Sequence, residues 1–190
     1  MKQLLLSVSI KMCKMKQHSF RLILVLQAII IVTMTHAYDF SAVNDDGVRI
    51  YYIYINGGLD VAVINNGMYG NDYHGNVNIP EEVTYKGKTM VVRQIGNHAF
   101  FESKVESVTI PKSVECIDKS AFRDCFYLKE VFISEGVLRI ESRVFENCYK
   151  LRSIVIPNSV ITIGERTFEN CKKLSTISGS LAKPCVENLA

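Results

Sequence analysis

Hydrophobic positions in the second half of the chain recur at an interval of 23 residues, without a gap across three consecutive units. The matching columns are Ile110, Ile133 and Ile156; Val114, Val137 and Val160; Ile117, Ile140 and Ile163; Phe122, Phe145 and Phe168; Leu128, Leu151 and Leu174; Val131, Ile154 and Ile177. This periodicity predicts an internal repeat in which each unit forms one structural coil.

Each unit predicts a strand, a turn and a second short strand. The pattern L-x-x-[VI]-x-I, as in residues 128–133, places its last two apolar residues on one face of a strand. Pro111 and Pro157 lack a backbone donor and should end that strand. The remainder, V-x-x-I-x-x-x-x-F-x-x-C, predicts a second short strand and one helical turn, with the Phe and the Cys pointing inward. One unit alone buries too little apolar surface to offset the entropy of ordering it, so the coils must stack into a solenoid.

An earlier unit, residues 77–103, keeps I-P-E-E-V and Q-I-G-N-H-A-F but inserts about nine residues near 84–92. It also carries Ser103 in the cysteine column. The repeat array is therefore predicted over residues 76–177, as four units and the start of a fifth, with a C-terminal tail at 178–190.

The motif I-P-x-S-V-x-x-I-G-x-x-x-F-x-x-C-x-x-L, as in Ile156 to Leu174, resembles the BspA-type leucine-rich repeat of bacterial surface and secreted proteins. That resemblance implies a curved, non-enzymatic solenoid involved in adhesion to host matrix proteins or other cells. Ser134-Glu135-Gly136 departs from the P-x-S pattern, and Ser178-Gly179-Ser180 interrupts the fifth unit. We predict a mainly β fold: a short leucine-rich-repeat solenoid of about 23-residue coils, each a strand plus a turn or short helical turn, preceded by a β-hairpin N-terminal cap.

Residues 38–75 have a different pattern, in which clusters of Asp, Asn and Gly separate the apolar runs 48–55 and 59–64. Such clusters favour tight turns, so this segment is predicted to form β-hairpins that cap the first coil. Tyr51, Tyr52 and Tyr54 are either part of the cap core or an exposed aromatic patch, and we favour the core.

Residues 1–37 predict a secretory signal peptide. A basic region ending at Arg21 precedes an apolar stretch from Leu22 to Met34, and Thr35-His36-Ala37 then places small residues around a possible cleavage point. The apolar stretch is short of the roughly 20 residues that span a bilayer, although an uncleaved anchor is the alternative. We therefore expect a secreted or cell-surface protein with no stable membrane span after cleavage.

Charge separates the signal from the rest of the chain. The 190 residues carry a formal charge of +3, but the first 37 hold five basic residues and no acidic one, which leaves the remainder near −2. Because binding to nucleic acid needs a concentrated positive field on the folded domain, we expect no nucleic-acid partner.

The sequence offers little for catalysis, metal binding or a cofactor, and we expect none of the three. His74 and His98 are the histidines that follow the signal, and both are interpreted as solvated surface residues. Cys125, Cys148 and Cys171 should form a column of buried free thiols, with disulfide bonding as the alternative. Cys116 and Cys185 are less constrained.

Surface recognition remains, and the strand pattern indicates which residues face outward. The candidate partner-binding residues are Thr109, Lys129, Phe132, Arg152 and Val155, with Phe132 as an aromatic anchor beside Val155 and the two cations as a rim. A second row, Tyr127, Lys150 and Lys173 with Lys172 beside it, predicts a basic corner suited to acidic glycans or surfaces. Both sets are also compatible with ordinary strand formers and solvated charges.

Two functional hypotheses follow. The first is an exported or cell-surface interaction module that adheres to a host or neighbouring-cell protein or glycan. The second is a structural spacer, or a truncated paralogue, without a dedicated ligand.

Overall fold

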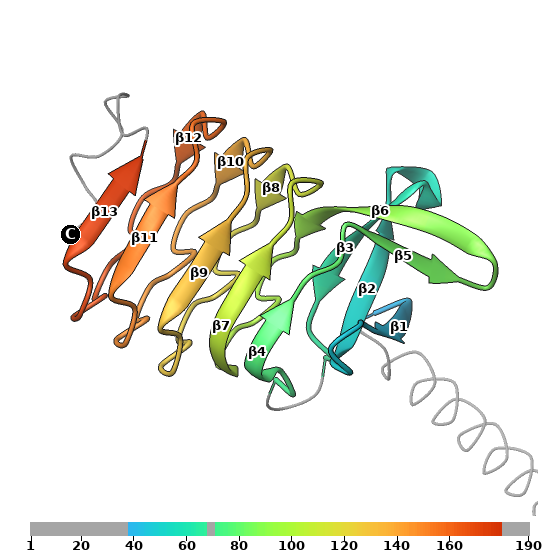
Figure 1. Ribbon diagram of the computed structural model, residues 1–190, viewed down its shortest axis with the longest axis horizontal. Helices are drawn as coiled ribbons and strands as arrows, with labels where there is room; N and C mark the ends of the chain where they lie inside the picture. The colour runs from blue at the N-terminus through green and yellow to red at the C-terminus, as the bar shows by residue number, and fades with distance from the viewer. Residues whose placement is uncertain (1–37, 68–70, 180–190) are drawn as a thin grey trace, which may run out of the picture. The chain divides into compact units, whose positions relative to one another are not determined.

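The computed structural model describes residues 38–67 and 71–179 (Figure 1). The predicted signal peptide, Cys185 and nearly all of the predicted tail lie outside these residues. Among the described residues, there is no helix long and apolar enough to cross a bilayer.

The repeat region is a solenoid with a ladder of strands on each side (Figure 1). The outer side carries β4 (His74–Asn78), β7 (Lys104–Ile110), β9 (Glu130–Ile133), β11 (Ser153–Ile156) and β13 (Thr176–Gly179). The opposite side carries β6 (Lys88–Ile95), β8 (Cys116–Ile117), β10 (Arg139–Ile140) and β12 (Thr162–Ile163). Ile117 pairs with Ile140, and Ile140 with Ile163, in parallel register. Residues that are one repeat apart in the sequence therefore pair with each other in the sheet, which confirms the predicted solenoid.

Both predicted strand ends at proline are confirmed, since β7 ends at Ile110 before Pro111 and β11 ends at Ile156 before Pro157. The extra residues of the first unit form a hairpin, in which β5 (Glu82–Tyr85) pairs antiparallel with β6 through a turn at Lys86-Gly87.

The N-terminal segment forms an antiparallel sheet of β1 (Phe40–Val43), β2 (Arg49–Ile55) and β3 (Asp60–Ile64), with a short 3₁₀ turn, η1 (Asn56–Gly58), joining β2 to β3. β3 also pairs in parallel with β6, so this sheet continues the ladder and covers the edge of the first coil. The tyrosines are divided: Tyr51 and Tyr52 are buried, whereas 42% of Tyr54 is exposed. The core assignment is correct for the first two and wrong for Tyr54, which packs against Phe40 at the sheet margin.

The core contains a single file of aromatic rings. Phe100, Phe122, Phe145 and Phe168 stack with centroid separations of 4.8, 5.4 and 5.7 Å and interplanar angles of 8, 15 and 6°. Tyr73 extends the file, with its ring centroid 4.5 Å from that of Phe100. The four phenylalanines are at most 4% exposed, so each ring depends on the coils on either side for its burial.

The predicted helical turn is wrong. Each coil instead turns through residues with left-handed backbone conformation, such as Ser120 (φ 57°) and Asp124 (φ 60°). The N–H groups of the turn alternate in direction: Phe122 donates to Val144 O of the next coil at 3.0 Å, whereas Arg123 donates to Ser120 O within its own turn at 3.1 Å. A helical turn would direct successive donors along its own axis. The observed turns instead supply a third set of hydrogen bonds between coils.

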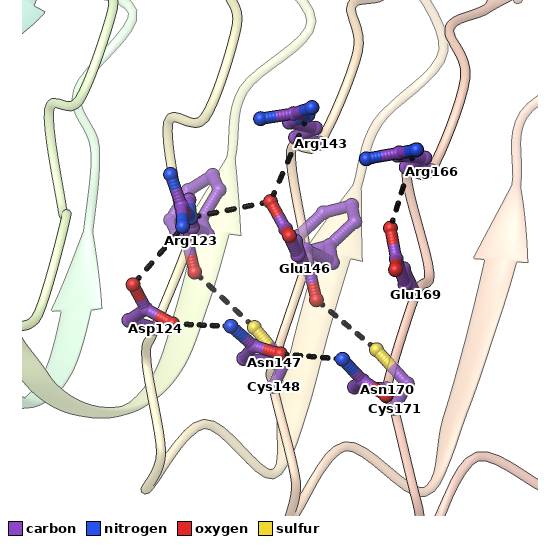
Figure 2. A network of polar contacts seen from close by, with 12 residues as sticks. Arg123, Asp124, Arg143, Glu146, Asn147, Cys148, Arg166, Glu169, Asn170 and Cys171 are labelled. Carbon is purple, nitrogen blue, oxygen red and sulfur yellow. Dashed lines mark hydrogen bonds and ion pairs between the residues drawn. The ribbon is translucent and has the colours of Figure 1, made fainter.

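Polar side chains also repeat from coil to coil at this turn (Figure 2). Asn147 Nδ2 donates to Asp124 Oδ1 at 2.6 Å, and Asn170 Nδ2 donates to Asn147 Oδ1 at 2.9 Å. Beside them, Arg123 Nε lies 3.2 Å from Glu146 Oε2, which gives the largely buried Glu146 carboxylate a cationic partner. These contacts, like the stacked aromatic rings, join equivalent positions of successive coils.

The cysteine column consists of free thiols, as predicted, with Cys125 and Cys148 buried and Cys171 half-buried. Each thiol donates to the carbonyl oxygen of a phenylalanine in the preceding coil: Cys148 Sγ lies 3.2 Å from Phe122 O, and Cys171 Sγ lies 3.1 Å from Phe145 O (Figure 2). Burial raises the pKa of Cys171 to about 11. The raised pKa disfavours the reactive thiolate of Cys171, and its thiol serves as a hydrogen-bond donor.

The departure at Ser134-Glu135-Gly136 has a structural explanation. The Glu135 carboxylate accepts hydrogen bonds from the backbone N–H groups of Asn158 and Ser159 in the next coil, at 3.1 and 3.0 Å. Gly136 has φ 127°, and a Cβ there would lie 2.1 Å from Lys112 O. The non-consensus loop thus joins two coils through a carboxylate and requires glycine for its close approach to a third coil.

We expect Phe145→Ala to lower the free energy of unfolding by about 3–5 kcal/mol, because it leaves a cavity between two stacked rings. Urea denaturation followed by far-UV circular dichroism measures this loss. Phe132→Ala is the matched control: its ring is 57% exposed, so its change should stay within about 0.5 kcal/mol. Equal losses in the two variants would contradict the stacked core.

A pH-dependent contribution to stability is expected from Glu135. The hydrogen bonds from Asn158 and Ser159 lower the pKa of this carboxyl in the folded protein. The stabilisation is therefore full above the unfolded pKa of about 4.3 and is lost as pH falls through the lower folded value.

The urea midpoint of wild type should accordingly exceed that of Glu135→Gln at pH 7, and the difference should shrink below about pH 4. Glu165→Gln, an exposed position, controls for the change in net charge. Identical midpoints of wild type and Glu135→Gln at pH 7 would show that the carboxylate does not join the coils.

Candidate binding surface

The outward face of β7, β9, β11 and β13 carries the predicted partner-binding residues. Thr109 pairs in register with Phe132, and Val155 pairs with Ser178. The Phe132 side chain is 57% exposed and that of Val155 is 61% exposed, although their strand neighbours Val131 and Ile154 are buried. Two large apolar side chains from adjacent coils therefore face solvent together.

The outer ladder of strands is interrupted between these two coils. β4, β7 and β9 form a three-stranded sheet, whereas β11 and β13 form a separate two-stranded sheet, and β9 and β11 lie side by side (Figure 1). Arg152 N–H donates to Lys129 O across the boundary at 3.4 Å. Beyond that bond an open hollow of about 310 Å³ lies between the strands, lined by residues 130–134 and 153–155.

The hollow brings together part of the predicted set. Phe132 and Val155 line it, whereas Thr109, Lys129 and Arg152 lie on the surrounding face and do not line it. Glu130, Ser134 and Ser153 also line the hollow but were not among the predicted partner-binding residues. Their outward positions follow from the repeat, but the division of the ladder, which opens the hollow, has no signal in the spacing of the sequence.

The two cations of the predicted rim differ in their surroundings. Lys129 Nζ bonds Glu106 Oε2 at 2.6 Å, and this hydrogen bond, followed by the charges of Lys129 and Lys150, lowers the pKa of Glu106. Arg152 is exposed. Among the described residues, no carboxylate lies within 4.0 Å of its guanidinium. Arg152 is therefore the cation of this rim that is available to a partner.

A second surface, here called the aromatic–lysine corner, lies just before the outer strands and comprises Phe126, Tyr127, Tyr149, Lys150, Lys172 and Lys173. Phe126 and Tyr149 stack with centroids 5.3 Å apart and an interplanar angle of 14°. Lys150 Nζ lies 4.5 Å from the centre of the Tyr127 ring, and Lys172 Nζ lies 4.8 Å from that of Tyr149. The structure thus brings the predicted basic row together with Phe126 and Tyr149. Their 23-residue spacing, Phe126–Tyr149–Lys172, was a signal available in the sequence.

The histidines do not form a reaction centre. His74 is exposed, and its Nδ1 lies 2.8 Å from Asp72 O. His98 is half-buried against Phe101, so the solvated interpretation is correct for His74 and incomplete for His98. Burial, followed by the charges of Arg123 and Lys119, lowers the pKa of His98. Across residues 38–67 and 71–179, no three His, Cys, Asp or Glu side chains are grouped as a metal site requires.

Solved structures share this architecture. A leucine-rich repeat protein from Bacteroides capillosus is 28% identical with a TM-score of 0.60, over 68% of this chain and 93% of that one. Another from Bacteroides ovatus is 29% identical with a TM-score of 0.57, over 74% of this chain and 41% of that one. A leucine-rich cell surface protein from Faecalibacterium prausnitzii is 21% identical with a TM-score of 0.52, over 74% of this chain and 42% of that one. The chain thus spans less than half the length of two of these proteins.

No curated protein sequence matches the chain significantly. The family profile described as the BspA type leucine-rich repeat region does match, in six copies over residues 93–182. The matched region is a repeat region, in agreement with the stacked coils described above. Residues 93–182 are therefore BspA-type leucine-rich repeats.

Proposed function

We propose that this protein is an exported, non-enzymatic interaction module that adheres to a partner on a host or neighbouring cell through the outer face of β7, β9, β11 and β13. The observation that carries the proposal is the hollow between β9 and β11, with Phe132 and Val155 exposed on its walls. Exposed aromatic and aliphatic side chains beside a hollow with polar groups in its wall are typical of an interface anchor.

The dimensions of the hollow favour a macromolecular partner. At about 310 Å³ and open to solvent, it is near the lower limit of small-molecule pockets, which enclose most of a ligand's surface. A partner's apolar side chain would enter it against Phe132, while Glu130, Ser134 and Ser153 offer hydrogen bonds around it. This arrangement favours a protein over a neutral glycan at this face.

Export is proposed on the basis of residues 1–37, where a basic region precedes a short apolar stretch and small residues. A cell surface protein is among the proteins that share the fold.

We expect Phe132→Ser to weaken saturable binding to the partner about thirtyfold, as the loss of a central aromatic anchor does. Immobilised extracellular-matrix proteins and whole host cells serve as the binding surfaces, and surface plasmon resonance or flow cytometry measures the affinity. Ile161→Ser is the matched control, because Ile161 is similarly exposed at 52% but lies beside β12 on the opposite ladder.

Equal binding by wild type and Phe132→Ser would reject the outer face as the interface. An absence of saturable binding by the wild-type protein to every surface would instead favour the structural spacer.

A further inference from the structure

The aromatic–lysine corner is separate from the hollow and has a different chemistry. None of its residues lines the hollow. Within the described residues, no carboxylate lies within 4.0 Å of the amine of Lys150, Lys172 or Lys173, whereas the neighbouring Lys129 is paired with Glu106. Among the described residues these three lysines therefore have no carboxylate at ion-pair distance, although the charge of Lys150 contributes to the lowered pKa of Glu106.

Two of these cations are held in place by aromatic rings. Lys150 lies over Tyr127 and Lys172 over Tyr149, and Tyr149 in turn stacks on Phe126. Cation–π contacts restrict long side chains that would otherwise sample many rotamers. An anion that pairs with these ammonium groups consequently meets a lower ordering cost than it would at an isolated surface lysine.

The cations are spaced by the repeat. Lys150 and Lys173 occupy equivalent positions in adjacent coils, in the register set by Ser153 and Thr176. The separation between coils at the corner is that of the Phe126 and Tyr149 rings, 5.3 Å. Lysines of successive coils are therefore close enough for one extended polyanionic chain to pair with more than one of them.

The aromatic rings favour a glycan over a nucleic acid. A base would need an open ring face for stacking, but Lys150 covers a face of Tyr127, and Tyr149 lies between Phe126 and Lys172. Residues 38–190 carry a formal charge near −2, which does not favour the broad positive field that a nucleic-acid backbone needs. The exposed Tyr127 and the half-buried Tyr149, in contrast, have hydroxyls suited to sugar hydrogen bonds.

We propose that the aromatic–lysine corner is a binding site for an acidic polysaccharide, whose sulfate or carboxylate groups pair with Lys150, Lys172 and Lys173. This site is distinct from the Phe132 face and does not depend on the function proposed for it.

The test measures binding of the full-length protein to heparin and hyaluronan, which carry sulfate and carboxylate groups, and to neutral dextran. The triple variant Lys150→Gln, Lys172→Gln, Lys173→Gln should bind the acidic polysaccharides about tenfold or more weakly than wild type. A second triple variant, Lys86→Gln, Lys88→Gln, Lys119→Gln, has the same net charge and alters exposed lysines elsewhere, so it should bind as wild type does. Thermal unfolding confirms that both variants are folded.

Phe132→Ser should bind heparin as wild type does, which separates this site from the proposed adhesion face. Equal weakening by the two triple variants would overturn the proposal, since it would indicate general electrostatic attraction. Failure of the wild-type protein to bind either acidic polysaccharide would also overturn it. Tighter binding to single-stranded DNA or to phosphatidylserine vesicles, lost in the corner variant, would assign the site to a different class of partner.

Discussion

The structure depends on a single constraint: a coil can bury its apolar residues and pair its backbone only against another coil. Phe145 is covered by Phe122 on one side and by Phe168 on the other. The same two boundaries are crossed by strand pairs, by hydrogen bonds between turns, and by thiols that donate to phenylalanine carbonyl oxygens. Because all these contacts recur at one spacing, they fix the register of the inner residues without requiring a particular side chain at the outward positions.

That division explains where binding chemistry can arise. Thr109, Phe132, Val155 and Ser178 occupy equivalent outward positions, yet they range from polar to aromatic. Each of the two candidate surfaces combines side chains that differ between adjacent coils. One surrounds the hollow beside Phe132 and Val155, and the other consists of lysines lying over aromatic rings. A repeat scaffold thus presents different chemistry at the same position of successive coils without disturbing the core.

Much of the fold could be predicted from the sequence because the register is encoded by columns of identical residue types. The single file of Phe122, Phe145 and Phe168 follows from the 23-residue interval. The strand ends before Pro111 and Pro157 follow from the missing backbone donor of proline. The turn was predicted incorrectly because V-x-x-I-x-x-x-x-F-x-x-C does not reveal the left-handed backbone of Ser120 and Asp124. Hydrogen bonding to the next coil, rather than local propensity, selects that conformation.

The candidate site was only partly predictable, for a related reason. Alternation along the strand placed Phe132 and Val155 outside, but the hollow depends on a division of the ladder between β9 and β11 that no single residue encodes. Cation–π contacts at the corner likewise depend on side-chain directions across two coils. The spacing of residues along the sequence thus does not reveal how side chains of two adjacent coils are placed relative to each other.

Double-mutant cycles in the aromatic file test the stacking of coils most directly. The account predicts a coupling energy of about 0.5–1.5 kcal/mol between Phe122→Leu and Phe145→Leu, whose rings are in contact. Phe100→Leu and Phe145→Leu, which are separated by Phe122, should be additive within about 0.5 kcal/mol. An absence of coupling between Phe122 and Phe145, or equal coupling in the two cycles, would contradict the account.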